Sequence, residues 1–335
     1  MDLFSLTKKE LEEYMVEHNQ KKFRGKQLLD WVYKKGVLNN EKMSNLPDDL
    51  KTKGALGLNI LPLKEKLIQK SLDGTMKVLL ELSDGELVES VYIPENDRAT
   101  VCFSSQVGCT MGCSFCATGQ SGFSRNLTAG EIVGQLYFWR HIKGLPVTNA
   151  VAMGQGEPFH NWDNFKKAIN IINDPDCFNL GARHLTVSTC GIVPGILALA
   201  KEPWQINLSI SLHAPSDELR SQIMPINRRF PLKELIQAVE EYIRVTNRRV
   251  TFEYTVIPNF NDGEMNAALL VALLKNKLVH VNVIPVNPLI GQGASFKDAE
   301  EFARLLQGKL NVTVRRSRGA DIDAACGQLK RKVLD

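Results

Sequence analysis

The sequence lacks any long hydrophobic run. Its longest apolar stretch, near Ala267–Leu274, is far too short to cross a bilayer. The charged, amphipathic start does not resemble the basic and then apolar pattern of a secretory leader. Internal repeats and low-complexity segments are absent, and a net charge of +4 argues neither for nor against a nucleic-acid partner. We therefore expect a cytoplasmic globular protein with no membrane partner and no disulfide framework.

Three of the seven cysteines stand close together, because Cys109, Cys113 and Cys116 form a C-x3-C-x2-C run. A zinc site would take a second cysteine pair or added histidines. No second C-x2-C pair exists, and none of the six histidines lies in this loop. Three thiolates can instead bind three irons of a 4Fe–4S cluster. Such clusters normally take four cysteines, so the fourth iron would stay open to a small molecule. We expect one cluster per chain with these three ligands.

This loop resembles that of the radical S-adenosylmethionine (SAM) enzymes, in which the open iron binds SAM. An electron carrier would want a fourth cysteine and a smaller chain. Inert, buried cysteines would not usually gather within eight residues that also hold glycine. An oxygen-sensitive cluster also fits a reducing cytoplasm.

From Ala99 onward, strand-like runs alternate with helical stretches, which predicts a parallel sheet with right-handed crossovers. Six units are too few for a complete eight-fold barrel, so we expect a partial (β/α)6 barrel of the radical SAM kind. The predicted strands are Thr100–Ser104, Asn149–Met153, Leu185–Thr189, Ile206–Leu212, Val250–Ile257 and His280–Val286. The predicted organisation is an N-terminal helical accessory domain at 1–55, a β-rich connector at 56–97 and the core at 98–335.

The N-terminal segment reads as helical. Thr7 and Glu10 form a capping box, and a second helix is expected over Gly25–Lys35, with Gly36 as its stop. Positive charge gathers on this segment, which is either a solvated helix face or, with an RNA substrate, a set of phosphate contacts. The cluster comprises Lys21, Lys22, Arg24, Lys26, Lys34 and Lys35.

A glycine-rich turn, Met153–Pro158, follows the second predicted strand and would let backbone approach a ligand. It is not a dinucleotide fingerprint, because Phe159 stands where the third glycine belongs. It resembles the GGEP-like SAM motif instead. Further polar residues stand at the carboxyl ends of strands, where α/β folds bind ligands, although such side chains more often make ordinary loop hydrogen bonds.

Several segments together resemble the RlmN family of radical SAM methyltransferases, which methylate carbon 2 of an adenine in RNA. The resemblance runs from the N-terminal helices to the C-terminus. It is carried by Arg98–Gly119, Met153–Pro158, Ser211–Pro215, Met224–Asn227 and Asp321–Leu329. Gln155 departs from the more usual methionine of the family, with neighbours that match.

The resemblance implies a role for each candidate residue. Cys109, Cys113 and Cys116 would bind the cluster, Cys326 would be the methyl-carrying nucleophile, Cys102 its thiol partner, and Glu89 the general base. Glu89 could equally be an ordinary exposed strand carboxylate. The residues implied in SAM binding are Gly156, Glu157, Ser188, Ser211, Leu212, His213 and Asn287. Cys177 and Cys190 receive no role and are interpreted as structural.

The implied chemistry suits these residue types. Carbon 2 of adenine lies between two ring nitrogens and cannot attack the methyl sulfonium of SAM, whereas a thiolate can. Cys326 would take the methyl group first. A second SAM would then yield a 5′-deoxyadenosyl radical that removes hydrogen from the S-methyl group. The resulting carbon radical would add to adenine, and Cys102 would release the product by forming a transient disulfide.

Two rival interpretations remain. A Cfr-type enzyme, which methylates carbon 8 of the same ribosomal adenine, would share the cysteine set, although segments such as Val91–Glu95 look more RlmN-like. A non-enzymatic iron–sulfur RNA-binding module would not need an open iron. The resemblance implies 23S rRNA and tRNA as substrates, recognised by shape and a splayed base. It also implies an electron donor such as flavodoxin or ferredoxin, and we expect a monomer.

Overall fold

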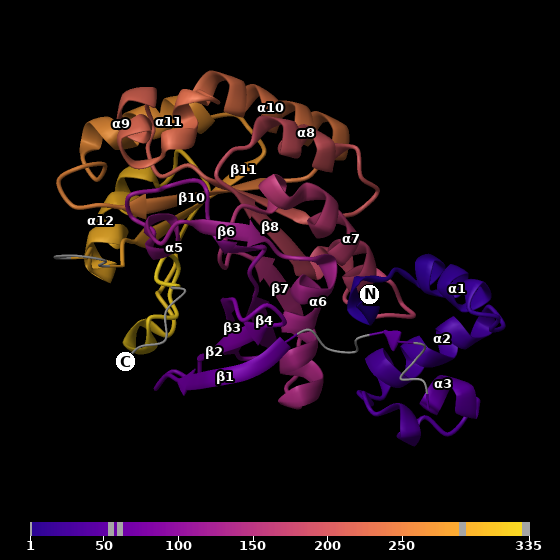
Figure 1. The fold of residues 1–335 in the computed structure, drawn as a ribbon. Helices are drawn as coiled ribbons and strands as arrows, with labels where there is room; N and C mark the ends of the chain where they lie inside the picture. Colours follow the sequence, from indigo (N-terminus) through magenta and orange to yellow (C-terminus); the bar gives the residue numbers. More distant parts are fainter. Residues whose placement is uncertain (1, 53–56, 59–62, 288–292, 330–335) are drawn as a thin grey trace.

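A curved ten-stranded sheet forms the centre of the computed structural model, which describes residues 2–52, 57–58, 63–287 and 293–329 (Figure 1). The strand order is β1-β2-β3-β4-β7-β8-β9-β10-β11-β12. The strands are β1 (Leu63–Lys70), β2 (Met76–Leu82), β3 (Leu87–Glu95), β4 (Arg98–Cys102), β7 (Asn149–Ala152), β8 (Leu185–Thr189), β9 (Asn207–Ser211), β10 (Val250–Val256), β11 (Val279–Pro285) and β12 (Val312–Val314). A separate antiparallel pair joins β5 (Gln106–Gly108) to β6 (Phe123–Asn126).

The strands from β4 to β12 run parallel to one another, as the alternation of strands and helices predicts. All six predicted strands are present, whereas β12 was not predicted because three residues are too short for a recognisable pattern. Helices cover the outer face of the sheet (Figure 1). They are α6 (Ala129–Tyr137), α7 (Trp162–Asn173), α8 (Val193–Ala200), α9 (Asp217–Ile223), α10 (Leu232–Thr246), α11 (Glu264–Leu274) and α12 (Phe296–Leu306). The short helix α5 (Ala117–Gln120) lies instead beside the C-terminal segment.

Strands β1 to β3 extend the same sheet in antiparallel fashion through the β3–β4 pair. Gly74 and Gly85 stand in the two turns that join these strands, where they adopt left-handed backbone with φ of 85° and 84°. Within the described residues β1 and β12 are edge strands, so the sheet is an open barrel. The boundary predicted between residues 55 and 56 lies outside the described residues.

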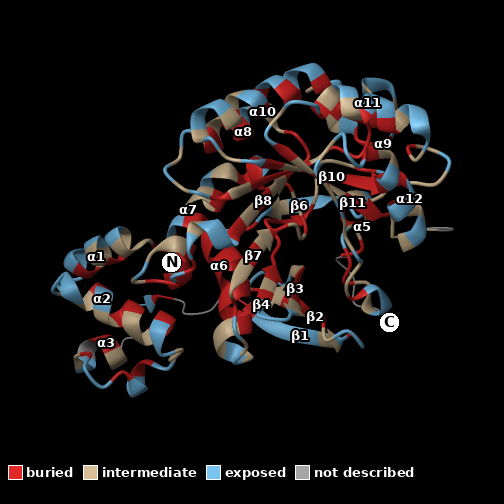
Figure 2. Ribbon diagram, turned by 180° about the vertical axis from the view of Figure 1, so that it is seen from behind, coloured by how far each residue is buried: buried red, intermediate tan, exposed pale blue. Residues whose placement is uncertain are grey.

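The core fills the space between the sheet and its helices (Figure 2). Its largest buried side chain is Trp139, whose Nε1 donates to Ser90 Oγ at 3.0 Å on β3. This bond satisfies the one polar atom of the indole ring. None of the described helices is long and apolar enough to cross a membrane.

The N-terminal helices α1 (Lys8–Glu17), α2 (Phe23–Leu29) and α3 (Asp48–Thr52) lie to one side of the barrel (Figure 1). The predicted capping box is present, because Thr7 Oγ1 accepts from Glu10 N and the Glu10 carboxylate accepts from Thr7 N. The second helix begins at Phe23 and continues as a π-helical turn to Lys34, and Gly36 then takes a φ of 66°.

One carboxylate joins these helices to the barrel. Asp176, which follows α7, lies 2.6 Å from Lys8 Nζ, 3.2 Å from Lys26 Nζ and 3.7 Å from Lys34 Nζ. The hydrogen bond from Lys8, together with the charge of Lys26, lowers the pKa of Asp176 to about 2. Part of the basic cluster predicted on this segment is therefore neutralised inside the protein.

We predict that Asp176→Asn lowers the free energy of unfolding by about 1 to 2 kcal/mol at neutral pH, because three ammonium groups lose their shared counter-charge. In the unsubstituted protein this contribution is present above pH 4 and is lost as the pH falls toward 2, since folding depresses the pKa of the carboxyl group. Urea titrations and hydrogen exchange of α1 and α2 measure the effect. Glu13→Gln, which breaks an exposed 3.9 Å pair with Lys9, is the control and should change little. Equal losses in both variants would contradict the prediction.

Candidate functional site

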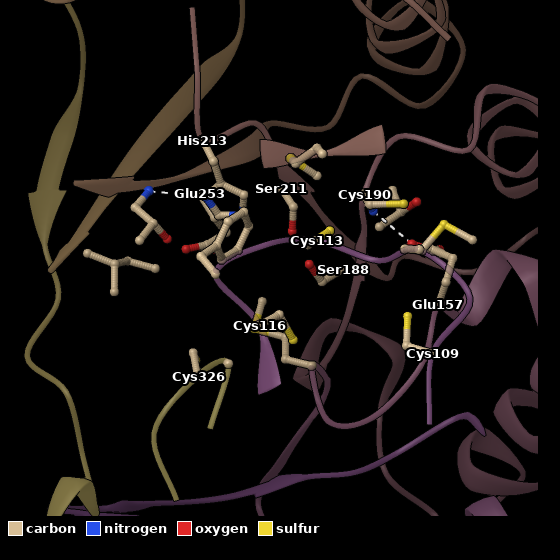
Figure 3. A pocket seen from close by; sticks show the side chains of 18 of the residues that line it. Cys109, Cys113, Cys116, Glu157, Ser188, Cys190, Ser211, His213, Glu253 and Cys326 are labelled. Carbon is tan, nitrogen blue, oxygen red and sulfur yellow. Dashed lines mark hydrogen bonds between the residues drawn. The ribbon is translucent and has the colours of Figure 1, made fainter. Parts of the chain in front are cut away.

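The three cysteines of the C-x3-C-x2-C run lie on the loop between β5 and α5, and all line one cavity at the carboxyl ends of the barrel strands (Figure 3). Gly108 begins this loop with a φ of 77°, and a Cβ there would lie 2.0 Å from the carbonyl oxygen of Gly122. Ser114 N donates to Ile223 O at 3.0 Å, which ties the loop to the end of α9. These contacts fix the loop against the barrel.

Burial raises the pKa of Cys109 to about 12 and also raises that of Cys113. Thiolates at these positions therefore require a bound cation. Among the described residues, no three His, Cys, Asp or Glu side chains converge on a point that could hold one metal ion. A 4Fe–4S cluster does not require the three side chains to converge on one ion, because each thiolate binds a different iron.

The glycine-rich turn after β7 forms a second wall of this cavity. Gly156 has a φ of 98°, and a Cβ there would lie 2.5 Å from Gln106 Cβ, so only glycine fits. Glu157 is buried, and its carboxylate accepts from Cys190 N at 2.7 Å and from Phe159 N at 3.1 Å. Burial raises the pKa of Glu157 despite these bonds.

Gln155, the one departure from the family pattern in this turn, is buried. Neither polar atom of its side chain has a hydrogen-bond partner among the described residues. Its backbone nevertheless keeps the turn in place, because Gln155 O accepts from Ser105 N at 2.8 Å and Gln155 N donates to Ser104 Oγ at 2.9 Å. The substitution therefore leaves the backbone of the turn intact but leaves a buried amide unsatisfied.

Four of the polar residues predicted at strand ends also line the cavity: Ser188, Ser211, His213 and Asn287. His213 has a left-handed φ of 57°, and its Nδ1 accepts from Thr255 N at 3.1 Å. Burial lowers the pKa of His213 to about 3, so the ring is neutral and its proton is on Nε2. Leu212 is fully buried and is not among the residues lining the cavity.

Cys326 reaches the cavity on a C-terminal loop that crosses the open side of the barrel. Gly327 O accepts from Ala117 N at 2.7 Å, and Leu329 O accepts from Thr118 Oγ1 at 2.9 Å. Asn287 Nδ2 donates to Cys326 O at 3.0 Å. The other end of the loop is anchored by Ser71, whose Oγ donates to Asp321 Oδ1 at 2.5 Å.

Cys102 ends β4 and is buried against Ala324 and Leu329 of the same loop. It lines a second, wider cavity that also includes Cys326. Burial, with the nearby Cys326, raises the pKa of Cys102 to about 12. The structure thus brings these two cysteines, 224 positions apart in the sequence, to one cavity, and both thiols are free.

Glu89 is placed differently. It is buried on β3 and forms an ion pair of 3.0 Å with Lys77, which also donates to Asp323 O at 3.2 Å. It is a lining residue of neither cavity. The alternative of an exposed strand carboxylate is wrong, since Glu89 is only 4% exposed.

Sequence reasoning missed several lining residues. Cys190, interpreted as structural, lines the first cavity beside Glu157, whereas Cys177 is buried near Asp176. Glu253 and Arg315 line both cavities. An acidic residue within the apolar run Val250–Val256 was a usable signal for Glu253, because buried carboxylates need a specific partner.

The second cavity is strongly basic. Six arginines line it against two carboxylates, Glu95 and Glu253, so a polyanion would be attracted to its mouth. The arginines are Arg98, Arg248, Arg249, Arg315, Arg316 and Arg318.

Two family models match this chain. Residues 103–272 match the radical SAM superfamily, and residues 1–56 match the ribosomal RNA large subunit methyltransferase N-terminal domain. A crystal structure of a radical SAM methyltransferase from Sphaerobacter thermophilus has a TM-score of 0.95 and 43% sequence identity, covering 99% of this chain and all of that one. The predicted radical SAM α/β fold with an N-terminal helical region is thereby confirmed.

Two similar relatives, from Alkaliphilus oremlandii and Streptococcus thermophilus, carry the name "Probable dual-specificity RNA methyltransferase RlmN". The first is 45% identical, covering all of this chain and 98% of the relative. The second is 44% identical, covering 99% of this chain and 88% of the relative. Full-length identity at this level leaves no doubt about descent, and the chain belongs to the RlmN family of SAM-dependent radical RNA methyltransferases.

Proposed function

We propose that this protein methylates carbon 2 of an adenosine in RNA through an S-methylcysteine intermediate on Cys326. One observation carries the proposal: Cys326 lines the cavity of the three-cysteine loop and also the cavity that contains Cys102. A single thiol can therefore meet SAM on one side and RNA and a second thiol on the other. Direct transfer of a methyl group from SAM to RNA would need neither cysteine.

The first cavity fits the cofactors of the family. Cys109, Cys113 and Cys116 would bind one 4Fe–4S cluster, which when bound supplies the electron for reductive cleavage of SAM. The buried, hydrogen-bonded carboxylate of Glu157 suits the ammonium group of SAM. The neutral ring of His213 would present Nε2–H as a donor. The full set that we infer to bind SAM is Gly156, Glu157, Ser188, Ser211, Leu212, His213 and Asn287.

Cys326 acts first as a nucleophile. Burial raises the pKa of this thiol, and the charge of Arg315 partly offsets that rise, which helps to form the thiolate that takes the methyl group from SAM. The methyl group on this sulfur would then lose one hydrogen atom to the radical derived from a second SAM. The resulting carbon radical would add to carbon 2 of adenine, so that protein and RNA become joined.

Two further residues complete the reaction. Glu89 would remove the ring proton as the adduct radical gives one electron back to the electron carrier. Cys102 would then attack the sulfur of Cys326, and the departing methylene carbon would take up a proton, which frees the methylated RNA and leaves a disulfide. Glu89 shares the Lys77 ammonium with the backbone of the Cys326 loop, so a small movement of that loop would change its surroundings. Cellular thiols would then reduce the disulfide.

We infer that the substrates are 23S rRNA, near the peptidyl-transferase centre, and the adenosine 3′ of the tRNA anticodon. The arginine-lined cavity would bind the phosphates of such RNA, and the splayed base would pass to Cys326. We assign the helical segment 1–55 to RNA binding and residues 98–335 to the catalytic core, with 56–97 as their connector. Flavodoxin or ferredoxin would supply electrons to a cytoplasmic monomer.

We predict that the reconstituted protein, given SAM, a reductant and unmodified 23S rRNA fragment without oxygen, forms 2-methyladenosine and 5′-deoxyadenosine. Mass spectrometry of nucleosides against isomer standards measures both. Formation of 8-methyladenosine instead would assign the chain to Cfr-type chemistry. Deoxyadenosine without methylated rRNA would direct the search to tRNA, and the absence of both products with an intact cluster would refute the proposal.

We predict that Cys326→Ala abolishes methylation of RNA, because no other thiol lines both cavities. Cys102→Ala should instead accumulate a covalent protein–RNA adduct that migrates slowly on denaturing gels. Cys177→Ala is the matched control, since it removes a buried cysteine outside both cavities and should retain activity. Multiple turnovers by Cys102→Ala would show that Cys102 does not release the product.

We predict that Glu89→Gln forms the covalent adduct but releases product about 100-fold more slowly or worse, since general bases contribute at least this much. Gel analysis of adduct against time separates the two steps. Glu81→Gln on the neighbouring strand, which breaks a surface pair with Lys66 at 3.1 Å, should behave as the unsubstituted protein does. If Glu89→Gln releases product at an unchanged rate, Glu89 is not the base that removes the ring proton.

A further inference from the structure

The two cavities meet at a junction with a mixed lining. Six residues line both: Met153, Glu253, Ile284, Asn287, Arg315 and Cys326. Met153 and Ile284 are apolar and come from β7 and β11, which three strands separate in the sheet. Asn287 is assigned above to SAM, and its amide also contacts Cys326 O and Ser317 Oγ, so it is not a candidate for a second ligand. Two charged groups and one thiol are left to meet a ligand.

Glu253 lies at this junction with half of its carboxylate unused. The residue is 5% exposed, in the middle of β10. Its Oε1 accepts from Ser209 Oγ at 2.7 Å and from Asn282 Nδ2 at 3.1 Å. Its Oε2 has no hydrogen-bond partner among the described residues. A buried carboxylate oxygen without a hydrogen-bond donor is unfavourable, so a bound ligand that offers an N–H or O–H group would be stabilised here.

Arg315 is the cation nearest to that oxygen. Its Nη1 lies 3.6 Å from Glu253 Oε2, which is an ion pair too long for a hydrogen bond. Burial raises the pKa of Cys326, and the charge of Arg315 partly opposes that rise. Arg315 therefore lies close to both Glu253 and Cys326 in the shared lining of the two cavities, and its fork of N–H groups is not fully engaged by the carboxylate.

We propose that Glu253 and Arg315 read the Watson–Crick edge of the target adenine, an inference that rests on the proposed function. Glu253 Oε2 accepts from the 6-amino group, and the Arg315 guanidinium donates to N1. Carbon 2, the atom next to N1, then faces Cys326. Carbon 2, N1 and the amino group follow one another along this edge of adenine, so one base could meet Cys326, Arg315 and Glu253 at the same time, since all three line the junction. Met153 and Ile284 supply apolar contact for the base.

This arrangement explains both selectivity and reactivity. Guanine carries a carbonyl oxygen and an N1–H in place of these groups, so it would face the carboxylate with an acceptor and the guanidinium with a donor. Sites built on such pairs reject the wrong base strongly, because buried polar groups are left unpaired. A donor on N1 also withdraws electron density from carbon 2, which favours addition of the carbon radical there.

RNA analogues test the proposal in the unsubstituted protein. Hairpins carry purine riboside, which lacks the amino group, 1-deazaadenosine, which lacks N1, or 7-deazaadenosine at the target position. The first two should slow methylation about 10- to 100-fold, and 7-deazaadenosine should change it less than about twofold. Loss with 7-deazaadenosine alone would mean that the Hoogsteen edge is read, and equal rates for all three would mean that neither group is read. Either result overturns the proposal.

Variants separate recognition from a structural role. Glu253→Gln should slow methylation of the adenosine RNA about 10- to 100-fold. It should not further slow methylation of the purine riboside RNA, because that base lacks the amino group that Glu253 would contact. Glu241→Gln, on the exposed face of α10, is the control and should match the unsubstituted protein with both RNAs. Equal slowing of both RNAs by Glu253→Gln, or weaker SAM binding, would overturn the proposal. Methylation of adenosine at another carbon, or none at all, would instead refute the proposed function.

Discussion

The chemistry of this protein depends on the hydrogen bonds that hold the C-terminal loop against the three-cysteine loop. An open barrel leaves one side unfilled, and residues 319–329 cross that side. Ala117 N to Gly327 O at 2.7 Å and Thr118 Oγ1 to Leu329 O at 2.9 Å bracket the position of Cys326. Cys326 therefore lies beside the loop of Cys109, Cys113 and Cys116 and within the cavity of Cys102. Without these bonds, the thiols would belong to separate parts of the chain.

Charge divides the space around Cys326 into two environments. The first cavity presents buried thiols, Glu157 and a neutral His213, which suit a cationic sulfonium and ammonium. The second presents six arginines, which suit a polyanion. Glu253 and Arg315, one charge of each sign, stand where the two meet. A cationic and an anionic substrate would therefore meet different linings on the two sides of Cys326.

Local patterns predicted much of the fold and the composition of the first cavity. Apolar runs predicted six parallel strands. The cysteine spacing and the glycine-rich turn predicted two segments that form walls of the first cavity. What escaped prediction depends on contacts between distant segments. The pairing of Lys77 with Glu89 follows from the register of β2 and β3, and the neutralisation of three N-terminal lysines follows from Asp176, more than 140 positions away. The three-residue strand β12 carries too little pattern to detect, although Arg315 directly follows it.

The most direct test of the central claim follows the hydrogen atoms of the methyl group. A single turnover with SAM trideuterated on its methyl carbon should give 2-methyladenosine carrying two deuterium atoms, because Cys326 holds the carbon while one deuterium passes to 5′-deoxyadenosine. Mass spectrometry of both nucleosides, with the Cys326 peptide isolated before RNA is added, measures each fate. A methyl group that reaches RNA with all three deuterium atoms, or a Cys326 that is never methylated, would contradict the account.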